Sequence, residues 1–136
     1  MERVCLKKIF IFSFAVILSL IFVQCSNANK VQDELEKYVE RENKNYPKII
    51  DDFTRLEGCE ALPSNTLRYN YTIQVESAML DTVVLKKALK EKLIHSIKTE
   101  PGSAFLRNNN VTFQYQYNDA ANSPVFRIDI PSEDYK

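Results

Sequence analysis

Hydrophobic and polar residues alternate along three short stretches of the chain and recur at helical spacing along two longer ones. The stretches TLRYNYTIQV (66–75), VTFQYQY (111–117) and VFRIDI (125–130) carry an apolar side chain at every second position. This period of two predicts strands with one buried face. Residues 30–45 and 83–97 place apolar side chains three and four positions apart among charged ones, which predicts two amphipathic helices.

The segment between the first helix and the first clear strand, residues 47–61, allows two interpretations. Its apolar residues fit one or two further helical turns that begin at Pro47, since proline is favoured at the first helical position. Alternatively, residues 54–61 form a strand that the turn-forming residues 62–65 connect to the next strand. The sequence leaves both interpretations open.

The second helix has clear start and stop signals. Residues 80–82 supply an N-cap, and we expect the helix to end between Lys98 and Pro101, because proline does not continue a helix. Its inward face is expected to carry Val84, Leu85, Ala88, Leu89, Leu93 and Ile97.

These elements predict an α+β fold. We expect a two-layer sandwich in which two helices cover one face of a three- or four-stranded antiparallel sheet, with the order α-(ββ)-α-ββ. The opposite face then carries the polar members of each strand, and it offers a flat surface to a glycan or a partner protein, although such a face is more often only solvated. The residues of this candidate binding face are Arg68, Asn70, Thr72, Gln114, Gln116 and Arg127.

The first 25 residues have the pattern of an export signal. Arg3, Lys7 and Lys8 precede an uncharged, mainly apolar run over residues 9–23. A helix of that length covers about 22 Å, less than the ~30 Å hydrocarbon core of a bilayer. A cleaved signal therefore fits better than a spanning helix.

The end of this segment, LIFVQC, resembles the signal of bacterial lipoproteins, in which the cysteine directly after the apolar run becomes the lipid-carrying N-terminus. Phe22 and Gln24 stand where that class usually has leucine and a small residue. The resemblance covers residues 1–25 alone. It implies a signal peptide over residues 1–24, a lipid on Cys25 and attachment to a membrane of the bacterial envelope.

The resemblance also implies a domain organisation. Residues 25–29 would form a short tether and residues 30–136 a single α+β domain. Two alternatives remain. Cleavage after Ala28 would release a soluble secreted or periplasmic protein, and an uncleaved segment would remain as an anchor.

The fate of the three cysteines depends on how the signal segment is processed. Cys5 would be removed with the signal peptide, and a lipid on Cys25 would leave Cys59 as a single thiol. An unmodified Cys25 could instead form a disulfide with Cys59, because exported compartments permit disulfides. We interpret Cys59 as a small, half-buried apolar residue rather than a reactive thiol.

Composition narrows the range of partners. The chain has a formal net charge of +0 at pH 7 and no long run of like charge, so we expect no nucleic-acid partner. Its only glycines are Gly58 and Gly102, which argues against a glycine-rich phosphate-binding loop. We therefore predict no cofactor.

The candidate chemistry is sparse. His95 is the only histidine, and with Glu91 one turn before it the ligands are too few for a metal site. Asp51 and Asp52 are adjacent, so their side chains diverge. The sequence therefore predicts a small, non-enzymatic, lipid-anchored envelope protein that acts as a binding or assembly-accessory module. The alternative is a small exported hydrolase-like enzyme that uses residues around Cys59 or His95.

Overall fold

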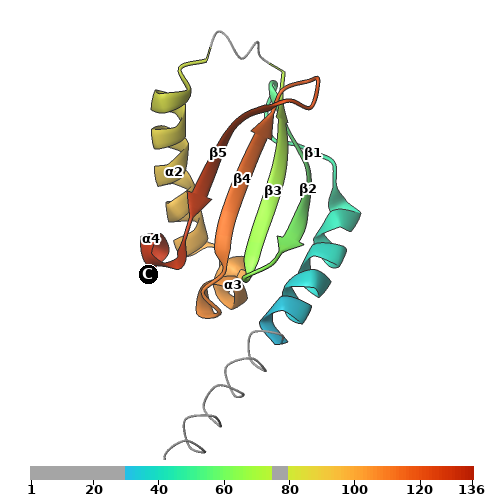
Figure 1. Cartoon of the computed structure of the whole chain (residues 1–136), viewed down its shortest axis with the longest axis vertical. Helices are drawn as coiled ribbons and strands as arrows, with labels where there is room; N and C mark the ends of the chain where they lie inside the picture. Colours follow the sequence, from blue (N-terminus) through green and yellow to red (C-terminus); the bar gives the residue numbers. More distant parts are fainter. Residues whose placement is uncertain (1–29, 75–79) are drawn as a thin grey trace, which may run out of the picture.

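The computed structural model describes residues 30–74 and 80–136. A five-stranded sheet in the order β1-β2-β3-β4-β5 forms its centre (Figure 1). The strands are β1 (Lys48–Ile49), β2 (Thr54–Leu62), β3 (Thr66–Ile73), β4 (Thr112–Asn118) and β5 (Pro124–Ile130). The helices are a first helix over residues 30–42, α2 (Thr82–Thr99), α3 (Ala104–Asn108) and α4 (Ser132–Tyr135), with 3-10 turns η1 (Asn43–Asn45) and η3 (Pro101–Ser103). The signal peptide, Cys25 and the tether lie outside the described residues and stay predictions.

The α+β class is confirmed, while the sheet differs from the expected one in two details. It has five strands instead of three or four, and β3 runs parallel to β4, whereas the other neighbours are antiparallel. The parallel pair has a physical reason. Helix α2 carries the chain back along the sheet, so that β4 starts at the same end as β3.

The strand interpretation of residues 47–61 is confirmed, and the helical one is wrong. β1 and β2 form a tight hairpin in which Ile49 lies opposite Arg55. A carboxylate oxygen of Asp51 accepts the N–H of Phe53 at 2.9 Å, and the N–H of Ile50 donates to Thr54 at 2.9 Å. These local hydrogen bonds favour a turn over a continued helix.

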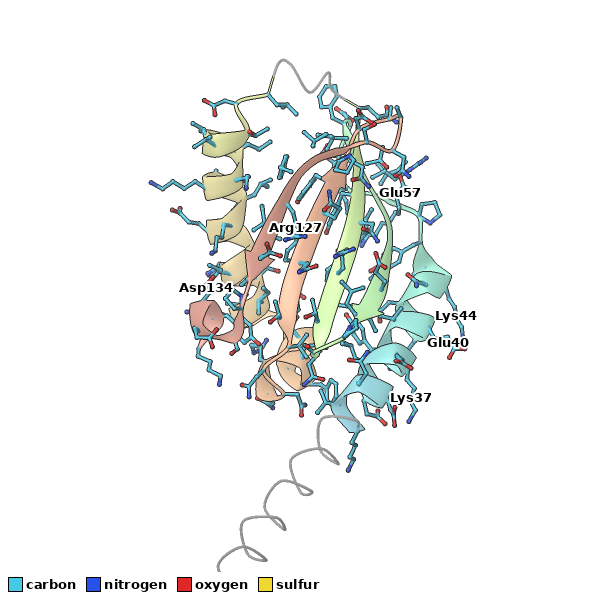
Figure 2. The ribbon with its side chains drawn as sticks, viewed as in Figure 1. Lys37, Glu40, Lys44, Glu57, Arg127 and Asp134 are labelled. Carbon is cyan, nitrogen blue, oxygen red and sulfur yellow. The ribbon has the colours of Figure 1, made fainter. Side chains whose placement is uncertain are left out.

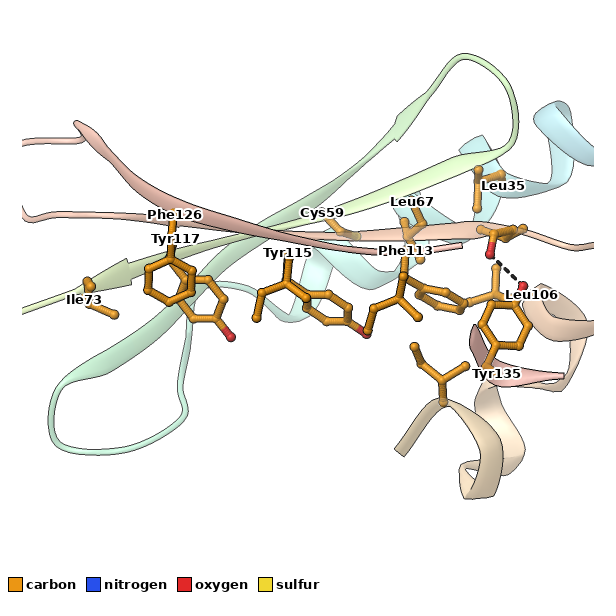
Figure 3. Packing of buried hydrophobic residues seen from close by; sticks show 14 residues of the cluster. Leu35, Cys59, Leu67, Ile73, Leu106, Phe113, Tyr115, Tyr117, Phe126 and Tyr135 are labelled. Atoms are coloured by element: carbon orange, nitrogen blue, oxygen red, sulfur yellow. Dashed lines mark hydrogen bonds between the residues drawn. The ribbon is translucent and has the colours of Figure 1, made fainter. Parts of the chain in front are cut away.

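Aromatic side chains form the core on one face of the sheet (Figure 3). Across the parallel pair, Tyr69 lies opposite Tyr115 and Tyr71 opposite Tyr117, and the two ring pairs stack with centroids 5.5 Å and 4.8 Å apart. Tyr117 also stacks on Phe126 of β5, at 4.5 Å. The alternation in the sequence therefore predicted the buried face of these strands correctly.

The helices cover this same aromatic face. Leu35 of the first helix, Ile97 of α2 and Leu106 of α3 are all buried in the core cluster. Tyr135 of α4 packs edge-on against Phe113, with ring centroids 5.6 Å apart. The predicted two-layer arrangement, with the helices on one face, is thus confirmed.

The inward face of α2 is narrower than predicted. Asp81 caps the helix as expected, with its carboxylate accepting the N–H groups of Val83 and Val84 at 3.1 Å. Val84 and Ala88, however, are exposed. The reason is that α2 packs against β5, an edge strand, so only a thin stripe of the helix faces the core.

Candidate partner-binding surface

The residues considered for catalysis do not share a cleft in the described structure. Cys59 is 5% exposed on β2, His95 is exposed on α2, and Asp51 lies in the exposed β1–β2 turn. β3 and β4 lie between β2, which carries Cys59, and β5, against which α2 with His95 packs. Among residues 30–74 and 80–136 no group of three or more potential ligands could hold a metal ion.

The environment of Cys59 makes it a poor nucleophile. Burial raises the pKa of the Cys59 thiol to about 11, with smaller contributions from the nearby carboxylates of Glu42 and Glu60. The thiolate is the reactive form of cysteine, and at neutral pH this thiol stays protonated. The structure thus agrees with the interpretation of Cys59 as a buried apolar residue.

The polar side chains predicted for the binding face do lie together. Arg68 lies opposite Gln114, and Asn70 lies opposite Gln116 across the β3–β4 pair. Gln116 in turn lies opposite Arg127 across β4–β5. Thr72 is two residues beyond Asn70 on the same strand and therefore on the same face. Whether this surface binds a partner stays a prediction.

Hydrogen bonds between strands hold this polar face in place. Both Nε and Nη2 of Arg68 donate to Oε1 of Gln114, at 3.0 Å each. Nδ2 of Asn70 donates to Oε1 of Glu60 at 2.7 Å, and a salt bridge of 3.8 Å joins Glu60 to Arg68. Arg68 and Asn70 are thus each joined by side-chain hydrogen bonds to a residue of a neighbouring strand.

The polar face is uncovered in the described part of the chain. The helices all contribute to the opposite, aromatic side, and in the view of Figure 1 no helix crosses in front of the four long strands. Figure 2 shows the side chain of Arg127 over β5 on this open side. We call this surface, with the residues predicted for it, the open sheet face.

A second exposed surface was missed by the sequence analysis. Large apolar side chains lie in solvent at Ile49 (77% exposed), Phe53 (59%), Val83 (78%) and Val84 (64%). They lie at one end of the molecule, where β2 and α2 both begin (Figure 1). Helical spacing had placed Ile49 and Phe53 in a further helical turn and Val84 on the inward face of α2, so the periodicity did not mark these residues as exposed. We call this group the apolar end.

Solved structures with a similar fold include a candidate secreted protein and two secretion-system pilotins. A candidate secreted protein from Pseudomonas aeruginosa aligns with a TM-score of 0.70 and 14% identity, over 81% of this chain and 96% of that one. The type II secretion system pilotin AspS from Vibrio cholerae aligns with a TM-score of 0.60 and 10% identity, over 82% and 97%. The type 2 secretion system pilotin EpsS from Vibrio vulnificus gives 0.57 and 8%, over 82% and 96%. At these identities the likeness shows the fold alone.

The remaining comparisons concern sequence and membrane insertion. No helix within residues 30–74 and 80–136 is long and apolar enough to span a bilayer. A search of curated proteins found no match. Residues 29–126 match the family model described as a domain of unknown function, DUF8479, and the chain belongs to that family.

Proposed function

We propose that this protein is a non-enzymatic assembly-accessory module of the bacterial envelope, anchored by a lipid on Cys25, and that its open sheet face binds an envelope partner. The observation that carries the proposal is the arrangement of the layers. The helices cover one side of the sheet, and the other side presents a flat, hydrogen-bonded polar surface. Solvent-exposed surfaces that are fixed in advance are suited to recognition by a partner.

The fold likeness supports an envelope role. Two of the proteins with a similar fold are pilotins of type II secretion systems, and the third is a candidate secreted protein. A pilotin-like accessory protein needs a stable scaffold and a partner surface, but no catalytic centre. The separation of Cys59, His95 and Asp51 in this fold fits that description.

The proposed tether also sets an orientation. Residues 25–29 can span at most about 17 Å when fully extended, so the start of the first helix would stay close to the membrane. The helix over residues 30–42 then rises about 20 Å. In Figure 1 the start of this helix and the apolar end lie at opposite ends of the fold. The apolar end would therefore point away from the anchoring membrane.

Site-specific photo-crosslinking in intact envelopes tests the proposal. A benzophenone amino acid would replace Gln116 or Thr72 on the open sheet face, and Glu91 on the exposed side of α2 as the control. We expect one discrete adduct from the first two positions, reduced by Cys25→Ser, and none from Glu91. Adducts from Glu91 alone, or none at any position, would contradict the proposal.

The nature of the adduct separates the two kinds of partner. A protein partner would give a band that protease digestion and mass spectrometry identify. A glycan would give a product that is sensitive to glycosidases. Either result retains the open sheet face as the binding surface.

A further inference from the structure

The outer edge of β5 has no neighbouring strand in the described structure. β5 stands last in the sheet, next to β4. Along a strand, the N–H and C=O groups of successive residues point alternately toward its two edges. One known hydrogen bond therefore shows the direction of the others. In β4 the N–H of Thr112 donates to the carbonyl of Asn65 on the β3 side, at 3.0 Å. Phe113, Tyr115 and Tyr117 therefore direct their N–H and C=O groups toward β5.

This alternation shows which groups of β5 point outward. Tyr115 directs its groups toward β5 and lies opposite Ile128, so the N–H and C=O of Ile128 bond to β4. Arg127 and Asp129, on either side of Ile128, point their N–H and C=O groups away from the sheet. These groups are available to a further strand.

A positively charged groove runs beside this edge. It has a volume of about 430 Å³. Its lining residues come from α2 and β5, and they are Lys86, Lys87, Lys90, Arg127, Ile128 and Asp129. The groove lies at the outer side of the sheet because α2 packs against β5 instead of over the centre.

Two cations of this groove have no carboxylate partner in the described residues. Nζ of Lys90 lies 2.8 Å from Oδ2 of Asp134 in α4, and Nε of Arg127 lies 3.0 Å from Oδ1 of Asp129. Figure 2 shows Arg127 on β5 and Asp134 near the end of the chain. Lys86 and Lys87 take part in none of the salt bridges of the described structure and are both exposed.

We propose that the β5 edge binds an extended acidic segment of a partner protein as an additional strand. The outward backbone groups of Arg127 and Asp129 supply the hydrogen bonds. Lys86 and Lys87 supply positive charge that attracts the carboxylates of the bound segment, on those of its side chains that face α2. Strand addition of this kind gains affinity from main-chain bonds and specificity from alternate side chains. The inference goes beyond the open sheet face, because it concerns the sheet edge and not its surface.

The same charges disfavour a second copy of this chain at the edge. Two copies paired antiparallel about Ile128 would gain only an exposed pair between Arg127 and Asp129 of the other copy, which contributes little. They would also bring two rows of α2 lysines together across the symmetry axis. Lysines beside an edge strand are a known protection against such self-pairing. An acidic strand has no such conflict and gains from the lysines.

Fluorescence anisotropy with labelled peptides tests the proposal on the full chain purified in detergent. The probe is an eight-residue peptide with glutamate at every second position and valine or threonine between them. The matched peptide carries lysine in place of glutamate. A third peptide keeps the glutamates but is N-methylated at alternate amides, which removes hydrogen-bond donors without altering the protein. We expect binding of the first peptide only, with an affinity that falls as salt rises.

Protein variants locate the site. Lys86→Glu with Lys87→Glu should weaken binding at least tenfold, whereas Lys92→Glu with Lys98→Glu, on the same helix but outside the groove, should not. Arg127→Pro removes an outward N–H that no bond to β4 uses, and proline is tolerated at edge strands in this orientation. It should weaken binding well beyond Arg127→Ala, which removes the side chain alone.

Three results would overturn the proposal. Equal binding of the N-methylated peptide would show that no strand is added, and this test is independent of whether Arg127→Pro folds. Binding unchanged by the Lys86 and Lys87 reversals would show that the groove is not involved. Concentration-dependent dimers that Arg127→Pro abolishes, without peptide binding, would assign the edge to a second copy. Crosslinking from Gln116 is independent of all three results.

Discussion

The side-chain amide of Asn43 binds the backbone of Cys59 as a neighbouring strand would. Oδ1 of Asn43 accepts the N–H of Cys59 at 2.9 Å, and its Nδ2 donates to the Cys59 carbonyl at 2.9 Å. β1 pairs only with Leu56 and Arg55 near the start of β2. Beyond that point the edge of β2 would be bare, and Asn43 satisfies its polar groups while it ties η1 to the sheet.

Loss of this amide should destabilise the fold. Asn43→Ala leaves the N–H and C=O of Cys59 without their side-chain partner. Because Asn43 is exposed and water can take its place, we expect a loss of about 1 kcal/mol in the free energy of unfolding. Asn45→Ala, at a likewise exposed position of the same turn but without the bonds to Cys59, is the matched control and should change it by less than about 0.5 kcal/mol. Urea denaturation of both variants measures the difference. Equal midpoints would show that the amide contributes nothing.

Gly58 provides a second test of the same contact. A Cβ built at Gly58 would lie 3.1 Å from Oδ1 of Asn43, closer than an ordinary van der Waals contact. Gly58→Ala should therefore displace the Asn43 amide and lower the free energy of unfolding. In an Asn43→Ala background the same substitution should cost much less, because the obstructing atom is gone. A double-mutant cycle checks this, and strictly additive effects would rule the contact out.

The orientation of β4 predicts opposite outcomes for neighbouring residues. Phe113 is 1% exposed and packs against Tyr135, so Phe113→Ala should cost about 3–5 kcal/mol. Gln114→Ala, on the open sheet face, loses only bonds from Arg68 and should cost less than about 1 kcal/mol. Thermal melts that compare the melting temperatures of the two variants test this prediction. A reversed order would mean that the register of β4 is shifted by one residue.

Alkaline pH should weaken the fold through Cys59. Burial raises the pKa of its thiol from 9.0 to about 11, so the folded state holds its proton to higher pH than the unfolded state does. The resulting stability is complete below pH 9 and is lost as the pH rises toward 11. Denaturation curves across this range, compared with those of Cys59→Ala, check the prediction. An identical pH dependence in both proteins would contradict it.

The alternation of apolar and polar residues predicted the parts of the fold that depend on residues close together in the sequence. The period of two in β3, β4 and β5 identified both the buried aromatic row and the open sheet face, because alternation fixes which side each residue faces. It could not predict that β3 and β4 run parallel, since parallel and antiparallel strands share that period. It also missed β1, whose two residues are too few to show any period.

The features that involve distant parts of the chain were beyond the sequence pattern. Asn43 and Cys59 are 16 residues apart, and nothing in their neighbourhoods signals an amide at a strand edge. The groove beside β5 depends on where α2 crosses the sheet, which also explains why Val84 and Ala88 are exposed instead of buried. Helical periodicity shows that a helix has an apolar stripe, but not how wide its contact will be.

Cys25 is the residue on which the proposed function depends most, because a lipid there would determine both the envelope location and the orientation of the apolar end. The most direct test is the intact mass of the mature protein purified from envelopes. We predict a chain that starts at Cys25, lacks residues 1–24 and carries the added mass of acyl groups. An unmodified chain that starts at Asn29, or one that still begins at Met1, would contradict it.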